Sequence, residues 1–74
     1  MKMRGKLFRI KYDSMRLYTE ENSLIGKLFN HEISLFLSFT NILNAKKLEL
    51  FHPLYGVCYL WTHDNDVSEL IQFV

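Results

Sequence analysis

The first dozen residues alternate between apolar and basic side chains. Over residues 6–12, Phe8, Ile10 and Tyr12 fall on one side, and the basic residues between them fall on the other. A period of two predicts a half-buried strand with a basic outer face. The Asp-Ser pair that follows favours a turn, after which residues 15–18 are predicted to return as the second strand of a hairpin.

The next long segment has a helical spacing. Its large apolar residues recur three or four positions apart: Leu24, Ile25, Leu28, Phe29, Leu35, Phe36, Phe39, Ile42 and Leu43. This spacing predicts an amphipathic helix over residues 24–44, started by the capping residues at 19–23. A strand is the alternative for residues 33–39, where apolar residues alternate with serine, but the spacing on both flanks favours the helix. In that helix, Ile33 and Leu37 would lie to the side of the apolar stripe.

Two extended runs, residues 46–52 and 57–63, are separated by the turn residues Pro-Leu-Tyr-Gly. A four-residue loop would pair His52 with Val57. One face of this hairpin would then carry Leu48, Leu50, Val57, Tyr59 and Trp61. The other face would carry Glu49, Phe51, Cys58 and Leu60. Both faces are largely apolar, so the hairpin is predicted to be central in the sheet or packed on both sides.

The chain ends after a break at residues 64–66. Asp66 and Glu69 have the spacing of a capping box, which predicts a short helix beginning at Val67. A closing strand over residues 70–74 is the alternative. With no repeat or linker, residues 1–74 are expected to form a single domain. The predicted class is α+β: a small two-layer domain in which an antiparallel sheet of about four strands, in the order ββαββ with a short C-terminal element, packs on one amphipathic helix.

The chain carries more large apolar side chains than one small core needs. Of its 74 residues, 49% are apolar and 15% are aromatic. An apolar surplus left on the surface indicates a contact with another molecule. The candidate residues are those at the side of the helix and on the outer hairpin face: Ile33, Leu37, Phe51 and Leu60. We expect this surface to bind a larger protein or to form a homodimer.

Charge is distributed unevenly along the chain. Residues 1–18 hold six basic residues against one acidic, a net +5, whereas residues 19–74 hold three basic against seven acidic, a net −4. Such asymmetry is typical of a basic face for a polyanion. The candidates to contact phosphates or an acidic partner are Arg4, Lys6, Arg9 and Lys11. Binding of nucleic acid without sequence preference is therefore the alternative function, although the spacing does not match an RNA-recognition strand motif.

No catalytic or metal-binding spacing links the three histidines, the acids and the single cysteine. His52 and His63 fall at opposite ends of the predicted hairpin, too far apart to share an ion. Cys58 is predicted to be a buried hydrophobe and not a nucleophile. The sequence therefore predicts no enzyme activity, no metal and no cofactor.

Glu32 raises a separate question, because it falls in the middle of the apolar stripe beside His31. It could reach solvent or a basic strand residue such as Arg9 or Lys11, or it could lie in the first turn of a new helix capped by Asn30. A functional pair with His31 is the remaining alternative. A buried carboxylate without a partner is costly, so a structural role is favoured.

In size, single-domain organisation and absence of a catalytic motif, the chain resembles in type the small inhibitor proteins made by phages and other mobile elements, such as anti-CRISPR proteins. That resemblance implies binding to, and blocking of, a larger host protein or nucleoprotein complex. The chain shows no signal peptide, and its longest apolar-leaning run, residues 33–39, is too short to span a bilayer. A single cysteine requires no oxidising compartment, so the expected location is the cytoplasm, without membrane attachment.

Overall fold

The structure is a computed structural model that describes residues 3–63 and 66–74. Its secondary structure is almost entirely β. The strands and the one short helix are β1 Leu7–Ile10, β2 Ser14–Tyr18, β3 Leu24–Phe29, β4 Ser34–Ile42, β5 Ala45–His52, β6 Gly56–Thr62, α1 Val67–Leu70 and β7 Ile71–Phe73. The predicted α+β class is wrong, because the described residues contain no long helix to form a second layer.

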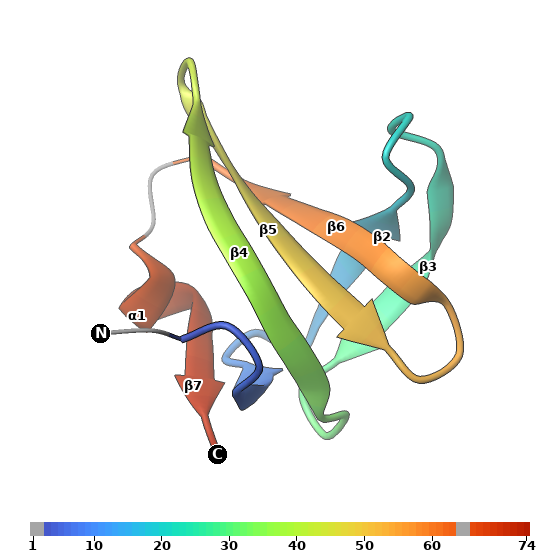
Figure 1. Cartoon of the computed structure of the whole chain (residues 1–74), viewed down its shortest axis with the longest axis vertical. Coiled ribbons are helices and arrows are strands. Elements are labelled where there is room, and N and C mark those ends of the chain that lie inside the picture. Colours follow the sequence, from blue (N-terminus) through green and yellow to red (C-terminus); the bar gives the residue numbers. More distant parts are fainter. Residues whose placement is uncertain (1–2, 64–65) are drawn as a thin grey trace.

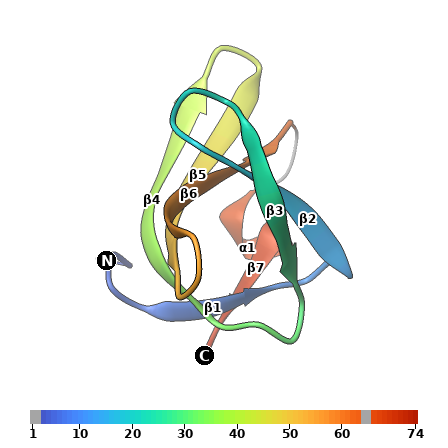
Figure 2. The same cartoon turned by 90° about the vertical axis from the view of Figure 1, so that its right-hand side faces the viewer.

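All seven strands belong to one antiparallel sheet, in the order β3-β2-β6-β5-β4-β1-β7. Figures 1 and 2 show that this sheet curls into a half-barrel instead of lying flat. Its concave side encloses the apolar core, and α1 contributes one side chain to that core. The buried core residues are Phe8, Ile10, Leu17, Leu28, Phe36, Leu48, Leu50, Cys58, Leu60, Leu70 and Ile71. Curling lets a single sheet bury an apolar face on itself, and this replaces the predicted helix as a cover.

The helix predicted over residues 24–44 is instead two strands, β3 and β4, joined by a turn. The strand alternative for residues 33–39 was the right one. The misleading spacing has a structural cause: the pairing of β4 with β5 shifts between Phe36 and Ser38, as at a β-bulge. Because Leu37 is the additional residue there, Phe36 and Phe39 both pack towards the core although three positions separate them. A bulge thus reproduces the spacing of a helix.

The N-terminal strands were predicted correctly, but their pairing was not. β1 pairs with β4 and β7, whereas β2 pairs with β3 and β6, so the two strands form no hairpin. The connection between them is held by other parts of the chain. The Lys11 N–H donates to the Leu70 carbonyl at 2.9 Å, and the Asn30 N–H donates to the Asp13 carbonyl at 3.1 Å. The local turn residues allowed a hairpin, and long-range pairing prevented it.

The C-terminal hairpin, β5 and β6, forms as predicted, but with a register one residue away from the expected one. His52 pairs with Gly56, so the loop contains three residues and not four. A one-residue slip moves side chains to the opposite face of a strand. Leu60, expected beside Phe51 on the outside, therefore pairs with Leu48 in the core and is 0% exposed. Val57, expected inside, pairs with Phe51 on the outer face.

Both alternatives for the end of the chain occur in succession. α1 begins at Val67 with the predicted capping box, in which the Glu69 carboxylate accepts a hydrogen bond from the Asp66 N–H at 3.4 Å. β7 follows at once and pairs with β1. Residues 64–65 of the predicted break lie outside the described residues.

Candidate functional site

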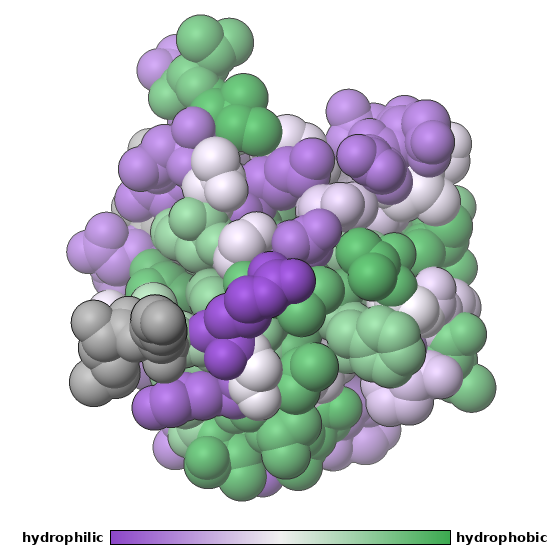
Figure 3. Space-filling view, in the orientation of Figure 1, coloured by the Kyte–Doolittle hydropathy of each residue, from purple (hydrophilic) through white to green (hydrophobic). Residues whose placement is uncertain are grey.

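Four apolar residues form a continuous row across the outer side of the half-barrel. Leu7 of β1 lies opposite Leu35 of β4, Leu35 lies opposite Phe51 of β5, and Phe51 lies opposite Val57 of β6. Leu7, Phe51 and Val57 are 48%, 45% and 51% exposed, and Leu35 is half-buried. We call these four residues the apolar row. Figure 3 shows apolar residues gathering near the start of β4 and the end of β5, with hydrophilic residues beside them.

The apolar row continues along β4 on both sides of Leu35. Ile33 lies just before the strand and is exposed, and Leu37 lies in the bulge and is half-buried. Three residues predicted for a partner surface, Ile33, Leu37 and Phe51, thus come together on one side, whereas Leu60 lies in the core. The sequence pattern did not indicate the other three members of the row, Leu7, Leu35 and Val57, as part of this surface. The strand alternative for residues 33–39 would have placed Leu35 beside Ile33 and Leu37.

Two arginines border the apolar row. The Arg4 Nη1 donates to the carbonyl of Leu37 at 3.1 Å, which holds this side chain against the bulge of β4. Arg9 is exposed on β1, two residues from Leu7 and therefore on the same face. We call the apolar row together with Ile33, Leu37 and these two arginines the docking surface.

The other two predicted cationic residues lie nearer the C-terminal elements. The Lys6 ammonium lies 5.9 Å from the centroid of the Phe73 ring, and the Lys11 ammonium donates to the Ser68 carbonyl at 2.6 Å. The four basic residues are exposed but do not form one compact cluster on β1.

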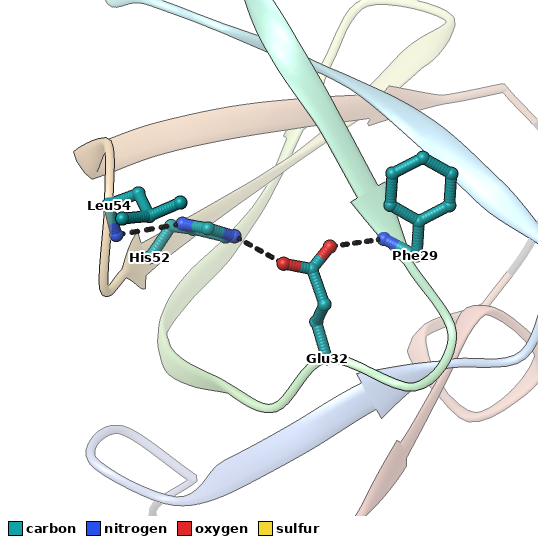
Figure 4. A network of polar contacts seen from close by, with 4 residues as sticks. All are labelled: Phe29, Glu32, His52 and Leu54. Carbon is teal, nitrogen blue, oxygen red and sulfur yellow. Dashed lines mark hydrogen bonds and ion pairs between the residues drawn. The ribbon is translucent and has the colours of Figure 1, made fainter.

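Glu32 and His52 form a polar network that joins two loops, as Figure 4 shows. One Glu32 oxygen accepts the Phe29 N–H at 2.9 Å, and the other lies 3.1 Å from His52 Nε2. His52 Nδ1 accepts the Leu54 N–H at 3.0 Å, so Nε2 must carry the ring proton and donate it to Glu32. His52 is 2% exposed, and its ring packs against Tyr55. The network ties the turn before β4 to the loop between β5 and β6.

This network corrects the accounts of Glu32 offered by the sequence. Its partner is His52, and not a basic residue of β1 or His31, whose ring stacks on Phe29 at 5.9 Å. The hydrogen bond from the Phe29 N–H is the main cause that lowers the pKa of Glu32 below 4.5, against a smaller opposing effect of burial. Both ring nitrogens of His52 are occupied, so the imidazole has no free position from which to act as a general base. The pair is structural in this geometry.

Cys58 is buried in the core, and burial raises the pKa of its thiol to about 11. The reactive form of cysteine is the thiolate, which is scarce at neutral pH when the pKa is so high. A rise of two units in the pKa lowers the fraction of thiolate about 100-fold. We therefore expect native protein at pH 7.5 to react with a thiol reagent at least about 100-fold more slowly than protein unfolded in urea. Absorbance during reaction with a chromogenic disulfide measures both rates. Equal rates in the two states would contradict a buried thiol.

Metal-ligating side chains do not converge in the described part of the chain. Residues 3–63 and 66–74 contain no group of three or more His, Cys, Asp or Glu side chains placed to hold an ion. Glu32 and His52 are accordingly a pair and not part of a larger ligand set.

The fold and this surface define the chain as a small all-β domain, a curled antiparallel sheet with an apolar row exposed on its outer side. No family model matches it, and neither the curated proteins nor the solved structures that were searched give a significant match. The expectations of an inhibitor, a phage origin and a homodimer thus gain nothing from relatives. No helix in the described residues has the length and apolar character needed to cross a membrane.

Proposed function

We propose that the chain is a protein-binding module that uses the docking surface to contact an acidic partner. The observation that supports this proposal is the register of four strands, which aligns Leu7, Leu35, Phe51 and Val57 in one exposed row. Fully burying a large apolar side chain contributes roughly 1.5–3 kcal/mol, so side chains left about half exposed forgo part of that free energy. Contiguous exposed apolar surface of this kind marks contact sites. A binding role agrees with the occupied nitrogens of His52 and the high pKa of Cys58, which leave neither group ready for catalysis.

Charge favours an acidic partner over a second copy of the chain. The docking surface as defined holds two arginines and no carboxylate, so a second copy using the same surface would offer these arginines no opposite charge. A typical interface takes about 800 Å² from each partner. The whole described chain exposes 4937 Å², so about a sixth of this surface would be covered. An area of that size must include the arginines as well as the apolar row.

We infer a cytoplasmic location for the chain and its partner, with which the single free cysteine is compatible. The one cysteine is free and buried in the core, so the fold requires no oxidising environment.

The proposal predicts that Phe51→Asp weakens binding at least about 30-fold without unfolding the protein. Phe51 is 45% exposed, so a charge at this position need not enter the core. Loss of a central contact residue lowers the free energy of binding by about 2 kcal/mol or more, which is roughly 30-fold in affinity. Purified wild-type protein would be used to isolate binding proteins from the native host. Affinity of each purified candidate for wild type and variant is then measured by calorimetry, and circular dichroism verifies the fold.

Leu43→Asp is the matched control, because Leu43 is 99% exposed at the turn between β4 and β5, away from the apolar row. A true partner binds this control like wild type, is acidic, and binds more weakly when Arg9→Glu is introduced. Equal binding to all variants would contradict the docking surface.

Sedimentation at micromolar concentration tests the alternative of a second copy. We expect a monomer, and a dimer dissociated by Phe51→Asp would assign the surface to a second copy. Binding to generic DNA or RNA at low salt, lost on reversing Arg9 and Lys11, would instead favour the nucleic-acid alternative.

A further inference from the structure

A cleft opens on another part of the sheet, between β2 and β6. These strands are neighbours, but in the described part of the chain their pairing is confined to Tyr18 opposite Tyr59. Towards the start of β2 and the end of β6 the two strands diverge, and the space between them has a volume of about 510 Å³. Sites for small molecules measure roughly 300–1,000 Å³. The cleft therefore has the size of a small-molecule site.

The side chains that line this cleft combine aromatic rings with positive charge. They include Tyr12, Tyr18, Trp61, Met15, Arg16 and His63. Among the described residues that line the cleft, Arg16 is the one with a permanent charge, and none is a carboxylate. The rings of Tyr12, Tyr18 and Trp61 suit a flat aromatic ligand. The Arg16 guanidinium suits an anion.

Trp61 is held in position from the side away from the cleft. The Lys47 ammonium lies 5.7 Å from the Trp61 ring centroid and 4.2 Å from the Tyr59 ring centroid, and Lys47 lines a separate, neighbouring hollow. The Tyr59 hydroxyl in turn donates to Glu49 at 3.1 Å. A ring ordered before a ligand arrives loses little freedom on binding, which favours affinity.

We propose that this cleft binds a nucleotide, with its base stacked on Trp61 and the tyrosines and its phosphate paired with Arg16. Bases stack on aromatic side chains with little regard to base identity, and an arginine guanidinium pairs well with a phosphate. The same chemistry is offered by a free mononucleotide and by one unit of a single strand. The cleft shares no residue with the docking surface, so this site is independent of the proposed protein binding.

The single tryptophan makes the test direct, because Trp61 is the only source of tryptophan fluorescence in the chain. Wild-type protein is titrated with adenosine monophosphate, adenosine, ribose 5-phosphate and an eight-residue adenine oligoribonucleotide. We expect the monophosphate to quench the fluorescence with a dissociation constant at least fivefold lower than those of adenosine and ribose 5-phosphate. Tighter binding of the oligonucleotide by tenfold or more would identify a single strand as the source, and equal affinity per site would identify the free nucleotide.

Variants assign the contacts, with binding followed by calorimetry. Arg16→Gln should weaken binding of the monophosphate about fivefold and leave adenosine unchanged, because an exposed ion pair contributes modestly. Trp61→Ala should weaken binding by roughly 5- to 150-fold, the equivalent of one stacking contact, and Trp61→Phe should retain most of it. Arg9→Gln, which removes an exposed strand arginine outside the cleft, is the matched control and should bind like wild type.

Absence of quenching and of binding heat with wild-type protein, at millimolar monophosphate and with the oligonucleotide, would overturn the proposal. Equal affinity for adenosine and for its monophosphate would overturn the role of Arg16. If Trp61→Ala fails to fold, the wild-type ligand series and the Arg16→Gln variant still decide the outcome.

Discussion

Leu60→Ala is expected to lower the free energy of unfolding by about 2–5 kcal/mol, the usual cost of truncating a fully buried leucine. Leu60 is 0% exposed and pairs with Leu48 at the centre of the sheet, so its removal leaves a cavity between β5 and β6. Urea denaturation followed by circular dichroism measures the loss. Since small domains are stable by only about 5–15 kcal/mol, this single change removes a large part of the stability.

Val57→Ala is the matched control for that change. Val57 lies three residues earlier on the same strand, on the outer face, and is 51% exposed, so its truncation should cost about 1 kcal/mol or less. The four-residue loop expected from the sequence would reverse the two values, because it places Val57 inside and Leu60 outside. A larger loss for Val57→Ala than for Leu60→Ala would therefore contradict the observed register.

Glu32→Gln is expected to lower the free energy of unfolding by about 1–2 kcal/mol at pH 7. This value is at the lower end of the cost of leaving a buried polar group without its partner, because the Glu32 side chain is partly exposed. The carboxylate accepts two hydrogen bonds, from the Phe29 N–H and from His52. An amide has one oxygen, so its NH₂ group must face one of these donors. Thermal and urea unfolding of the folded variant measure the difference.

The same pair predicts a pH dependence with a definite sign. The pKa of Glu32 is lower in the folded protein than the ordinary value of 4.5, chiefly because of the Phe29 N–H. Its stabilising contribution is therefore complete above pH 4.5 and is lost as the pH falls through the lowered pKa. The difference in stability between wild type and Glu32→Gln should therefore shrink as the pH falls below 4.5.

Glu21→Gln is the control for the pH series, because Glu21 is an exposed acid in the turn between β2 and β3. It should change the stability little at any pH. If both variants lose the same stability, or if the difference for Glu32→Gln does not shrink in acid, the bond between Glu32 and its partners contributes nothing to the fold.

The sequence by itself determined most of the strands and the final helix start. Alternation placed the first strand, although its outer face carries Leu7 as well as Arg9 and is not purely basic. The turn residues at 53–56 separated β5 from β6. The spacing of Asp66 and Glu69 located the start of α1. These features depend on side chains a few residues apart, which is why local patterns reveal them.

Apart from the β5–β6 hairpin, only the tertiary structure decided which strands pair, and it also decided the register and what the outer face carries. The bulge at Leu37 depends on how β4 meets β5, and it gave strand residues the spacing of a helix. The three-residue loop after His52 goes with burial of Leu48 and Leu60 together in the core, and it moved Leu60 inside and Val57 outside. The Glu32–His52 bond joins residues 20 positions apart, and the apolar row joins four strands from residues 7 to 57. Local preferences allow several pairings of nearly equal free energy, and only burial of the complete core selects one of them.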